Sequence, residues 1–327
     1  MGLLVDGKWV DQWYDTASSG GTFVRSVAGF RSCVERGGEH PPQRGRYRLY
    51  VADACPWAHR VRIMRALKGL EAFMDVTLVA PRMLEHGWTF AHPEPERQAS
   101  CLHEIYTAAR PDYTGRVTVP VLWDRLAGTI VSNESSEIMR MFNVAFDHET
   151  GNTLDVYPEH LRADIDAVND WVYHGINNGV YRSGFATTQA AYNDAVDELF
   201  DALDRAEAIL ATQPFLVGDH LTEADLRLVV TLLRFDLVYV THFKCDRRRI
   251  VDYPNLWNYT RQLYQLQAIR GTFVPEAVRE HYFCSHPTIN PHAIISTGPV
   301  LDFDAPHNRG SDPLSAIFRR EASVAAK

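Results

Sequence analysis

Cys55-Pro56-Trp57-Ala58-His59-Arg60 is the stretch that decides the fold of this chain, and it follows a strand-like run, Tyr47–Val51. Val61, Met64 and Leu67 then recur at helical spacing, and Gly69 is a typical stop signal. Proline suits the first position of a helix, where its missing N–H costs nothing. The sequence therefore predicts a strand, a short turn and a helix, with the cysteine at the N-terminal edge of that helix.

Cys55 is the candidate nucleophile of the chain. The start of a helix offers free backbone N–H groups and the positive end of the helix dipole. A thiol in that position ionises more readily than a free thiol, and the thiolate is the reactive form. His59 and Arg60, in the first turn, are expected to add positive field. The alternative is an inert, buried cysteine at a helix start.

The residue three positions after the cysteine indicates how an adduct would be cleared. A dithiol oxidoreductase carries a second cysteine there, whereas this chain has Ala58. A mixed disulfide on Cys55 must therefore be resolved by a thiol from solution. The abundant small thiol of the cytosol is glutathione.

Length and charge restrict the class of protein. A chain of 327 residues is long for one core and predicts two domains. Its formal net charge of -8 argues against a nucleic-acid-binding surface and against a polybasic membrane contact. The one dense basic run, Lys244–Arg249, is better explained as a solvated helix end or a loop with ion pairs.

The cysteines and histidines indicate a reducing compartment and no metal site. Five cysteines are scattered without paired spacing, which is typical of free thiols. The fourteen histidines form no Cys/His cluster with zinc spacing, so we expect no metal. No apolar run reaches the ~18 residues that a membrane span needs, and the N-terminus lacks a signal pattern. We therefore expect a cytoplasmic protein.

The chain is expected to have three parts. Residues 1–44 combine several aromatic residues with glycines and charges but show no period, which predicts an arm packed across the two domains. Residues 45–150 are expected to form a small α/β domain, and residues 151–327 a helical domain with an irregular tail. The fold class predicted is thus α/β followed by all-α.

The α/β part follows from its strand signals. Strand, helix and strand in succession predict a parallel crossover unit. A proline inside the third strand is anomalous unless Pro120 forms a cis bond at an edge that faces a site. Further predicted elements are strands at 76–79, 116–122 and 129–132, a helix near 96–109 inside an insertion at 81–115, and a helix that follows Asn133–Glu137.

Two roles of the Ser135 hydroxyl remain open from the sequence. Hydroxyl side chains at a helix start can cap the helix or bind an anion.

The helical domain that follows is predicted from apolar stripes, including a buried helix after Thr222-Glu223-Ala224-Asp225, which is typical of a capping box.

The order of elements looks like a thioredoxin-like domain followed by the all-helical domain of a cytosolic glutathione transferase. Six separated stretches make the resemblance closer, to the glutathionyl-hydroquinone reductases, or xi-class transferases. They are Cys55–Arg60, Gly87-Trp88-Thr89-Phe90, Val119-Pro120-Val121-Leu122-Trp123, Ser132-Asn133-Glu134-Ser135, Asn177-Asn178-Gly179-Val180-Tyr181 and Val240-Thr241-His242-Phe243-Lys244. The likeness runs from Val5 to about Leu301. It departs at a short Glu35–Arg46 loop and at Phe283-Cys284, which could alter the rim of the acceptor pocket.

The resemblance implies a reaction. The substrate is an aromatic hydroquinone that carries glutathione on a ring carbon. The Cys55 thiolate attacks the glutathione sulfur, and the hydroquinone leaves as its ring carbon takes up a proton. A second glutathione then releases oxidised glutathione, so that catalysis is covalent and ping-pong.

The resemblance also implies site residues. Glutathione contacts are expected from the cis-proline Pro120, the backbone of Val119, Glu134 and Ser135 at the γ-glutamyl end, and Trp88 and Arg116 at the other end. Tyr181 and Tyr282 are expected to line the hydroquinone site and to donate to the leaving ring, with Tyr239 as a further candidate. Without the resemblance, each tyrosine would be read as an ordinary core or surface aromatic.

Two other function classes are compatible with a cysteine at this position. One is an omega-like glutathione transferase with thioltransferase or dehydroascorbate reductase activity, which shares the cysteine but does not need the two tyrosines. The other is a glutathione-binding module without activity, in which a reactive cysteine would have no use. The family likeness further implies a homodimer.

Overall fold

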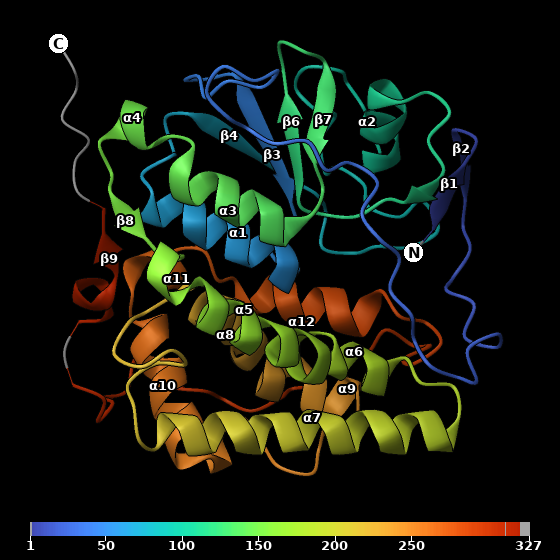
Figure 1. Ribbon diagram of the computed structural model, residues 1–327. Coiled ribbons are helices and arrows are strands. Elements are labelled where there is room, and N and C mark those ends of the chain that lie inside the picture. The colour runs from blue at the N-terminus through green and yellow to red at the C-terminus, as the bar shows by residue number, and fades with distance from the viewer. Residues whose placement is uncertain (1, 311, 321–327) are drawn as a thin grey trace, which may run out of the picture.

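The computed structural model describes residues 2–310 and 312–320. A mixed sheet with its helices forms one part of the molecule, and a bundle of helices forms the other (Figure 1). The last seven residues of the predicted 151–327 unit lie outside the described residues. The fold class predicted from the sequence is confirmed.

The central sheet has four strands in the order β4-β3-β6-β7. Its members are β3 (Tyr47–Val51), β4 (Met74–Leu78), β6 (Val121–Asp124) and β7 (Thr129–Ser132). β3 and β4 are parallel, with Leu49 opposite Val76, because helix α1 (Pro56–Leu67) returns the chain between them. β6 joins β3 in the antiparallel sense, as β7 joins β6. All five residues of β3 are buried, which fits its central place, and its one charged residue, Arg48, is paired with Glu94 at 2.7 Å.

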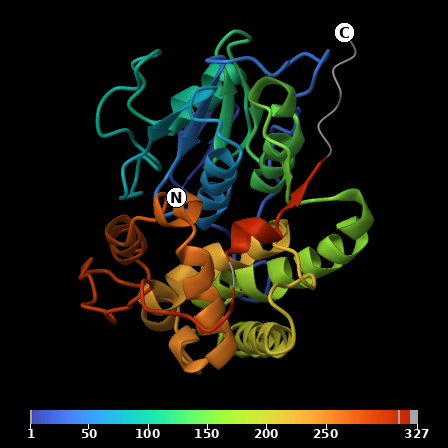
Figure 2. The same cartoon turned by 90° about the vertical axis from the view of Figure 1, so that its left-hand side faces the viewer.

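Two helices cover one side of the sheet, and an irregular segment lies on the other. α1 packs beside α3 (Ser135–Val144), and the two lie between the sheet and the helical bundle (Figure 1). The segment before α2 (Leu102–Ala109) lies on the other side of the sheet (Figure 2). α2 begins six residues later than the sequence predicts, because Glu104 closes a capping box with the backbone of Cys101.

Two expectations about strands are wrong. The predicted strand at 116–122 is divided into β5 (Gly115–Arg116) and β6, and the Val119–Pro120 peptide between them is cis, as expected. The proline therefore precedes the ladder of β6 instead of interrupting it. The arm also contains strands, β1 (Leu3–Val5) and β2 (Lys8–Val10), and β1 pairs with β5. Its partner β5 lies more than 100 residues away in the chain, so no local sequence period indicates this pairing.

The helical bundle is organised around α8 (Glu223–Arg234), whose twelve residues are all buried. The predicted capping box is present, with Thr222 and Asp225 each accepting from the other's backbone N–H. The other α-helices of the bundle are α5 (Arg162–Trp171), α6 (Gly179–Gly184), α7 (Gln189–Leu210), α9 (Val240–His242), α10 (Pro254–Tyr264), α11 (Gln267–Arg270) and α12 (Pro275–Cys284). The short helix α4 (Asp147–Thr150) follows α3 on the sheet side of the molecule (Figure 1). Two π-helical turns, Val172–Asn177 and Phe235–Tyr239, connect α5 to α6 and α8 to α9.

The tail after α12 is largely irregular, as predicted, but it ends in one ordered contact. β9 (Phe318–Arg319) pairs with β8 (Leu154–Asp155). Arg320 then donates to Asp147 and is paired with Asp155.

Close packing at α6 gives a first prediction. A methyl group at Gly184 would overlap the ring of Phe243, whereas a methyl group at Gly179 in the same helix would make ordinary contacts. We expect Gly184→Ala to lower the free energy of unfolding by about 1–3 kcal/mol, the usual cost of overpacking. Gly179→Ala is the control. Urea titration of both variants measures the difference, and equal stabilities would contradict this packing.

Candidate active site

Two adjoining pockets lie where the sheet, the arm and the helical bundle meet. The polar pocket is lined by Arg60, Arg116, Asn133, Glu134 and Ser135, among others. The apolar pocket is lined by Phe23, Cys55, Trp88, Tyr181, Phe185 and Tyr282, among others. Both pockets share Tyr14, Arg25, Trp57, Thr118 and Val119, so that they form one continuous site.

Cys55 precedes α1 as the sequence predicts. The backbone of Cys55 is extended, and Pro56 occupies the first turn of the helix. The carbonyl of Cys55 accepts from the N–H of His59. The side chain is partly exposed, and its Sγ donates to the carbonyl of Val119 at 3.6 Å. The candidate nucleophile therefore faces the backbone that precedes the cis-proline.

Burial raises the pKa of the Cys55 thiol above its ordinary value. The N–H of Ala58, the guanidinium of Arg234, the N–H of Trp57 and the guanidinium of Arg25 act in the opposite direction, but burial is the larger influence. The N–H groups of the helix start favour the thiolate, as the sequence predicts, but they do not bring the pKa of Cys55 below its ordinary value. Enclosure by the bundle and the arm outweighs the local field.

Of the two basic residues of the first turn, only Arg60 carries the expected positive charge. Burial and the neighbouring charge of Arg234 hold the pKa of His59 well below its usual value, so His59 is neutral and adds no positive charge. Burial lowers the pKa of Arg60 to about 9, which leaves it charged at neutral pH. The Arg60 guanidinium lies over Trp57, 4.9 Å from the ring centroid.

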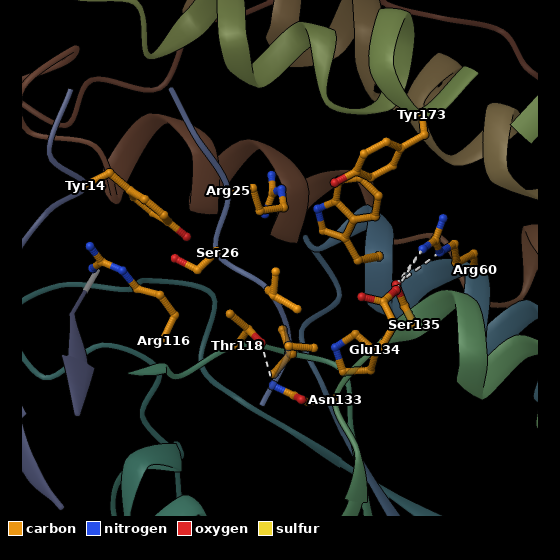
Figure 3. A pocket seen from close by; sticks show the side chains of 15 residues that line it. Tyr14, Arg25, Ser26, Arg60, Arg116, Thr118, Asn133, Glu134, Ser135 and Tyr173 are labelled. Atoms are coloured by element: carbon orange, nitrogen blue, oxygen red, sulfur yellow. Dashed lines mark hydrogen bonds and ion pairs between the residues drawn. The ribbon is translucent and has the colours of Figure 1, made fainter. Parts of the chain in front are cut away.

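The start of α3 forms one end of the polar pocket (Figure 3). Glu134, not Ser135, caps this helix, accepting from the N–H of Ser136 at 3.0 Å. Ser135 accepts from Arg60 at 2.7 Å, so capping does not explain its hydroxyl. Burial acts to raise the pKa of Glu134, but the hydrogen bonds from Ser136 and the charge of Arg60 hold it below its usual value. A carboxylate and a buried guanidinium thus stand together here, as required to bind a zwitterionic group.

The arm and β5 form the other end of the polar pocket, with Tyr14, Ser26 and Arg116 side by side (Figure 3). Arg116 lies over the ring of Tyr14, 4.1 Å from its centroid, and donates to the carbonyls of Gln12 and Trp13. Arg25 stands between the two ends, over Trp57 and Tyr181 at 4.9 and 5.0 Å.

Three tyrosine hydroxyls form a chain beside Cys55. Tyr181 and Tyr282 line the apolar pocket, and their hydroxyl oxygens are 2.6 Å apart. Tyr239 stands behind them, with its hydroxyl 2.9 Å from that of Tyr282. Burial raises the pKa of all three above the ordinary value, so each hydroxyl stays protonated at neutral pH. The pocket therefore offers neutral O–H donors.

Trp88 lies in the apolar pocket and not at the Arg116 end of the polar one. It stacks on His281 with ring centroids 4.9 Å apart, and burial lowers the pKa of that histidine to about 4. Phe283 and Cys284, which were expected at the rim of the acceptor pocket, are buried and are not among the residues that line either pocket.

Several residues of the site were not identified from the sequence. Arg25, Tyr14 and Phe23 come from the arm, which has no period that could assign a direction to its side chains. Phe185, His286 and the buried Arg234 come from the bundle, where an apolar or a helical pattern indicates only burial.

Among the described residues, no group of histidine, cysteine, aspartate and glutamate side chains is arranged to hold a metal ion. Within the same ranges, no helix is both long and apolar enough to cross a membrane.

Comparison with known families places this chain in the glutathione transferase superfamily. The glutathione S-transferase N-terminal domain matches residues 54–145, and the glutathione S-transferase C-terminal domain matches residues 189–262.

Individual relatives define the family more narrowly. The glutathionyl-hydroquinone reductase YqjG of Escherichia coli is 52% identical over 94% of this chain and 98% of its own length. The glutathionyl-hydroquinone reductase PcpF of Sphingobium chlorophenolicum is 51% identical over 92% and 97%. The glutathione-bound structure of YqjG superposes with a TM-score of 0.86, at 48% identity over 94% of this chain and 99% of the other.

A xi transferase from Phanerochaete chrysosporium also superposes closely, with a TM-score of 0.85 and 52% identity over 89% of this chain and 96% of the other. The chain thus belongs to the glutathionyl-hydroquinone reductases, the xi class of glutathione transferases.

Proposed function

We propose that this protein is a glutathionyl-hydroquinone reductase that removes glutathione from glutathionyl-hydroquinones through a mixed disulfide on Cys55. The observation that carries the proposal is that Cys55 and the hydrogen-bonded hydroxyls of Tyr181 and Tyr282 line the same apolar pocket. An aromatic ring in this pocket meets a sulfur nucleophile and neutral proton donors together.

The first half-reaction forms the mixed disulfide. The Cys55 thiolate attacks the glutathione sulfur, a sulfur–sulfur bond forms, and the bond between that sulfur and the ring carbon breaks. The electron pair stays on the ring carbon, which takes up one proton, and the hydroquinone leaves. Tyr181 and Tyr282 hydrogen-bond or protonate the leaving ring, and Tyr239 holds the hydroxyl of Tyr282.

The second half-reaction restores the enzyme. The thiolate of another glutathione attacks the glutathione sulfur of the mixed disulfide, and Cys55 leaves as a thiolate. The products of the full cycle are the hydroquinone and oxidised glutathione. The cycle consumes one free glutathione for each substrate molecule. Its thiol sulfur and the thioether sulfur of the substrate join in a disulfide and together give up two electrons to the ring carbon, so glutathione is a cosubstrate and no metal is required.

Glutathione is assigned to the polar pocket. Glu134 and Ser135 receive its γ-glutamyl group, since the carboxylate matches an ammonium and Arg60 stands beside the hydroxyl. Val119 and the cis-proline Pro120 hold the cysteinyl group opposite Cys55. Arg116 is assigned to the glycyl end. Trp88 is assigned to the boundary with the acceptor site, because it lines only the apolar pocket.

Turnover of a glutathionyl-hydroquinone, compared with hydroxyethyl disulfide and dehydroascorbate, tests the function. A reductase of this kind strongly prefers the first substrate. The alternative is an omega-like transferase with thioltransferase or dehydroascorbate reductase activity, and preference for either of the other substrates would favour it. Loss of turnover on all three would point to a glutathione-binding module.

Ala58 gives a prediction on the resolving step. The residue is fully buried in the first turn of α1, and its backbone N–H faces Cys55. We expect Ala58→Cys to create a dithiol that resolves its own mixed disulfide, because Cys-x-x-Cys pairs exchange internally. The variant should gain insulin-reducing activity and lose its dependence on the second glutathione. Ala58→Ser is the matched control, and unchanged stoichiometry in the cysteine variant would contradict the prediction.

Organisation and location complete the proposal. We propose an arm at residues 1–44, a glutathione-binding domain at 45–150 and a hydroquinone-site domain at 151–327. The polar pocket lies largely on residues of the second part, which supports this division. We also propose a cytoplasmic homodimer. All five cysteines are free thiols, which fits a reducing compartment, while the dimer is supported by the family likeness.

A further inference from the structure

A buried arginine lies behind the reactive cysteine. Arg234 ends α8 in the helical bundle and is fully buried. Its Nε donates to the carbonyl of Ala54 at 2.8 Å, and its Nη2 donates to the carbonyl of Asp53 at 3.1 Å. The guanidinium is therefore one hydrogen bond away from the peptide that carries the N–H of Cys55.

The charge of Arg234 is not neutralised by a carboxylate in the described part of the chain. Its remaining contacts are the carbonyl of Val230 at 2.8 Å, Nδ1 of His59 at 3.1 Å and the ring of Phe273. His59 is neutral, so it accepts from Arg234 through Nδ1. The carboxylate of Asp53 is paired with Arg62, so Asp53 contacts Arg234 only through its backbone carbonyl.

An unpaired buried charge is costly, and proteins keep such groups mainly where they have a function. The other buried arginine of the same helix shows the contrast, because Arg227 is paired with Glu223 at 2.9 Å. At Arg234, the anion that the reaction creates nearby is the Cys55 thiolate. It forms before the first attack and again when the mixed disulfide is resolved.

We propose that Arg234 is a positioning residue that fixes the Cys55 turn through two backbone carbonyls and supplies the buried positive charge which stabilises the Cys55 thiolate. The proposal rests on the proposed function for its place in the cycle. It extends that function by adding a charge from the helical bundle to the N–H groups of the helix start, which favour the thiolate in the same direction.

Other charged and titratable groups also surround the thiol. They are the charged Arg25 of the arm, the neutral histidines His59, His281 and His286, the protonated tyrosines Tyr181 and Tyr282, and Arg60, which is engaged with Ser135. Of the two guanidinium groups that favour the thiolate, Arg234 has the larger influence, and Arg25 is partly exposed to solvent. Bulk ions screen an exposed charge far more than a buried one.

The test measures the thiol directly in the full chain. The rate of alkylation of Cys55 by iodoacetamide, followed by mass spectrometry of the Cys55 peptide, is recorded against pH without any hydroquinone. We expect Arg234→Gln to raise the midpoint pH of this alkylation curve by about one pH unit or more, the usual effect of removing a nearby opposite charge. Below the midpoint, the alkylation rate then falls about 10-fold or more.

Two variants separate charge from structure. Arg234→Lys keeps the charge and should keep most of the wild-type midpoint, although it loses the planar fork. Arg227→Gln removes a paired buried arginine from the same helix, and it should lower the melting temperature without moving the midpoint. An unchanged midpoint pH in Arg234→Gln would overturn the proposal. A shift in Arg234→Lys or in Arg227→Gln as large as the shift in Arg234→Gln would overturn it as well.

A measurement on the wild type covers the case in which Arg234→Gln does not fold. The wild-type midpoint should stay constant between low salt and 1 M KCl, because the stabilising charge is buried. A midpoint that rises with salt would assign the field to exposed groups such as Arg25 and overturn the proposal. Since alkylation needs no hydroquinone, these outcomes are independent of the turnover assays that test the proposed function.

Discussion

The Cys55→Ser variant should bind glutathione but show no reduction of a glutathionyl-hydroquinone. A hydroxyl cannot form the mixed disulfide on which both half-reactions depend. The polar pocket is built from other residues, Glu134 and Ser135 among them, so glutathione binding should persist. Substrate turnover and calorimetric titration with glutathione measure the two properties separately.

Mass spectrometry of the wild type identifies the reacting sulfur. Treatment with substrate should give one glutathione adduct, on Cys55. The other four cysteines are internal controls: Cys33 is exposed, Cys101 is partly exposed, and Cys245 and Cys284 are buried. An adduct on any of those four in place of Cys55 would remove the central claim of the mechanism.

Loss of the two tyrosine hydroxyls should separate the aromatic substrate from other disulfides. Removal of a positioned proton donor typically lowers the rate by ~10²-fold or more. We therefore expect Tyr181→Phe with Tyr282→Phe to reduce turnover of a glutathionyl-hydroquinone by that factor. Glutathione affinity should hold, and a small mixed disulfide should react almost as before, because a thiolate leaving group needs no ring protonation.

Two outcomes would argue against this role. If both tyrosines only shape the pocket, phenylalanine keeps the rings and both substrates react nearly as in the wild type. Equal losses on both substrates would instead place the hydroxyls in a role at the Cys55 thiolate. Tyr239→Phe is the matched control, since that hydroxyl contacts Tyr282 but lies behind the pocket. We expect a smaller loss for it than for Tyr282→Phe alone.

The sequence by itself determined the elements whose signals are local. The strand Tyr47–Val51, the start of α1 at Pro56 and the Thr222 capping box all follow from residues within a few positions of one another. Such signals act through backbone geometry and short-range hydrogen bonds, which do not depend on distant parts of the chain. The resemblance in six stretches added the fold class and the family.

Only the tertiary structure decided the features that depend on distant partners. β1 forms against β5 across more than 100 residues, and the predicted strand at 116–122 is divided in two at the cis-proline. Three tyrosines from separate helical segments meet only after the bundle is packed.

The electrostatics of the thiol were likewise settled by packing. A helix start predicts an acidic thiol, but the bundle and the arm enclose Cys55, and burial raises its pKa. The same enclosure makes His59 neutral and brings Arg234 against the carbonyls of Asp53 and Ala54. Burial and charge proximity are properties of the folded molecule, because the groups that cause them lie about 180 residues apart in the chain.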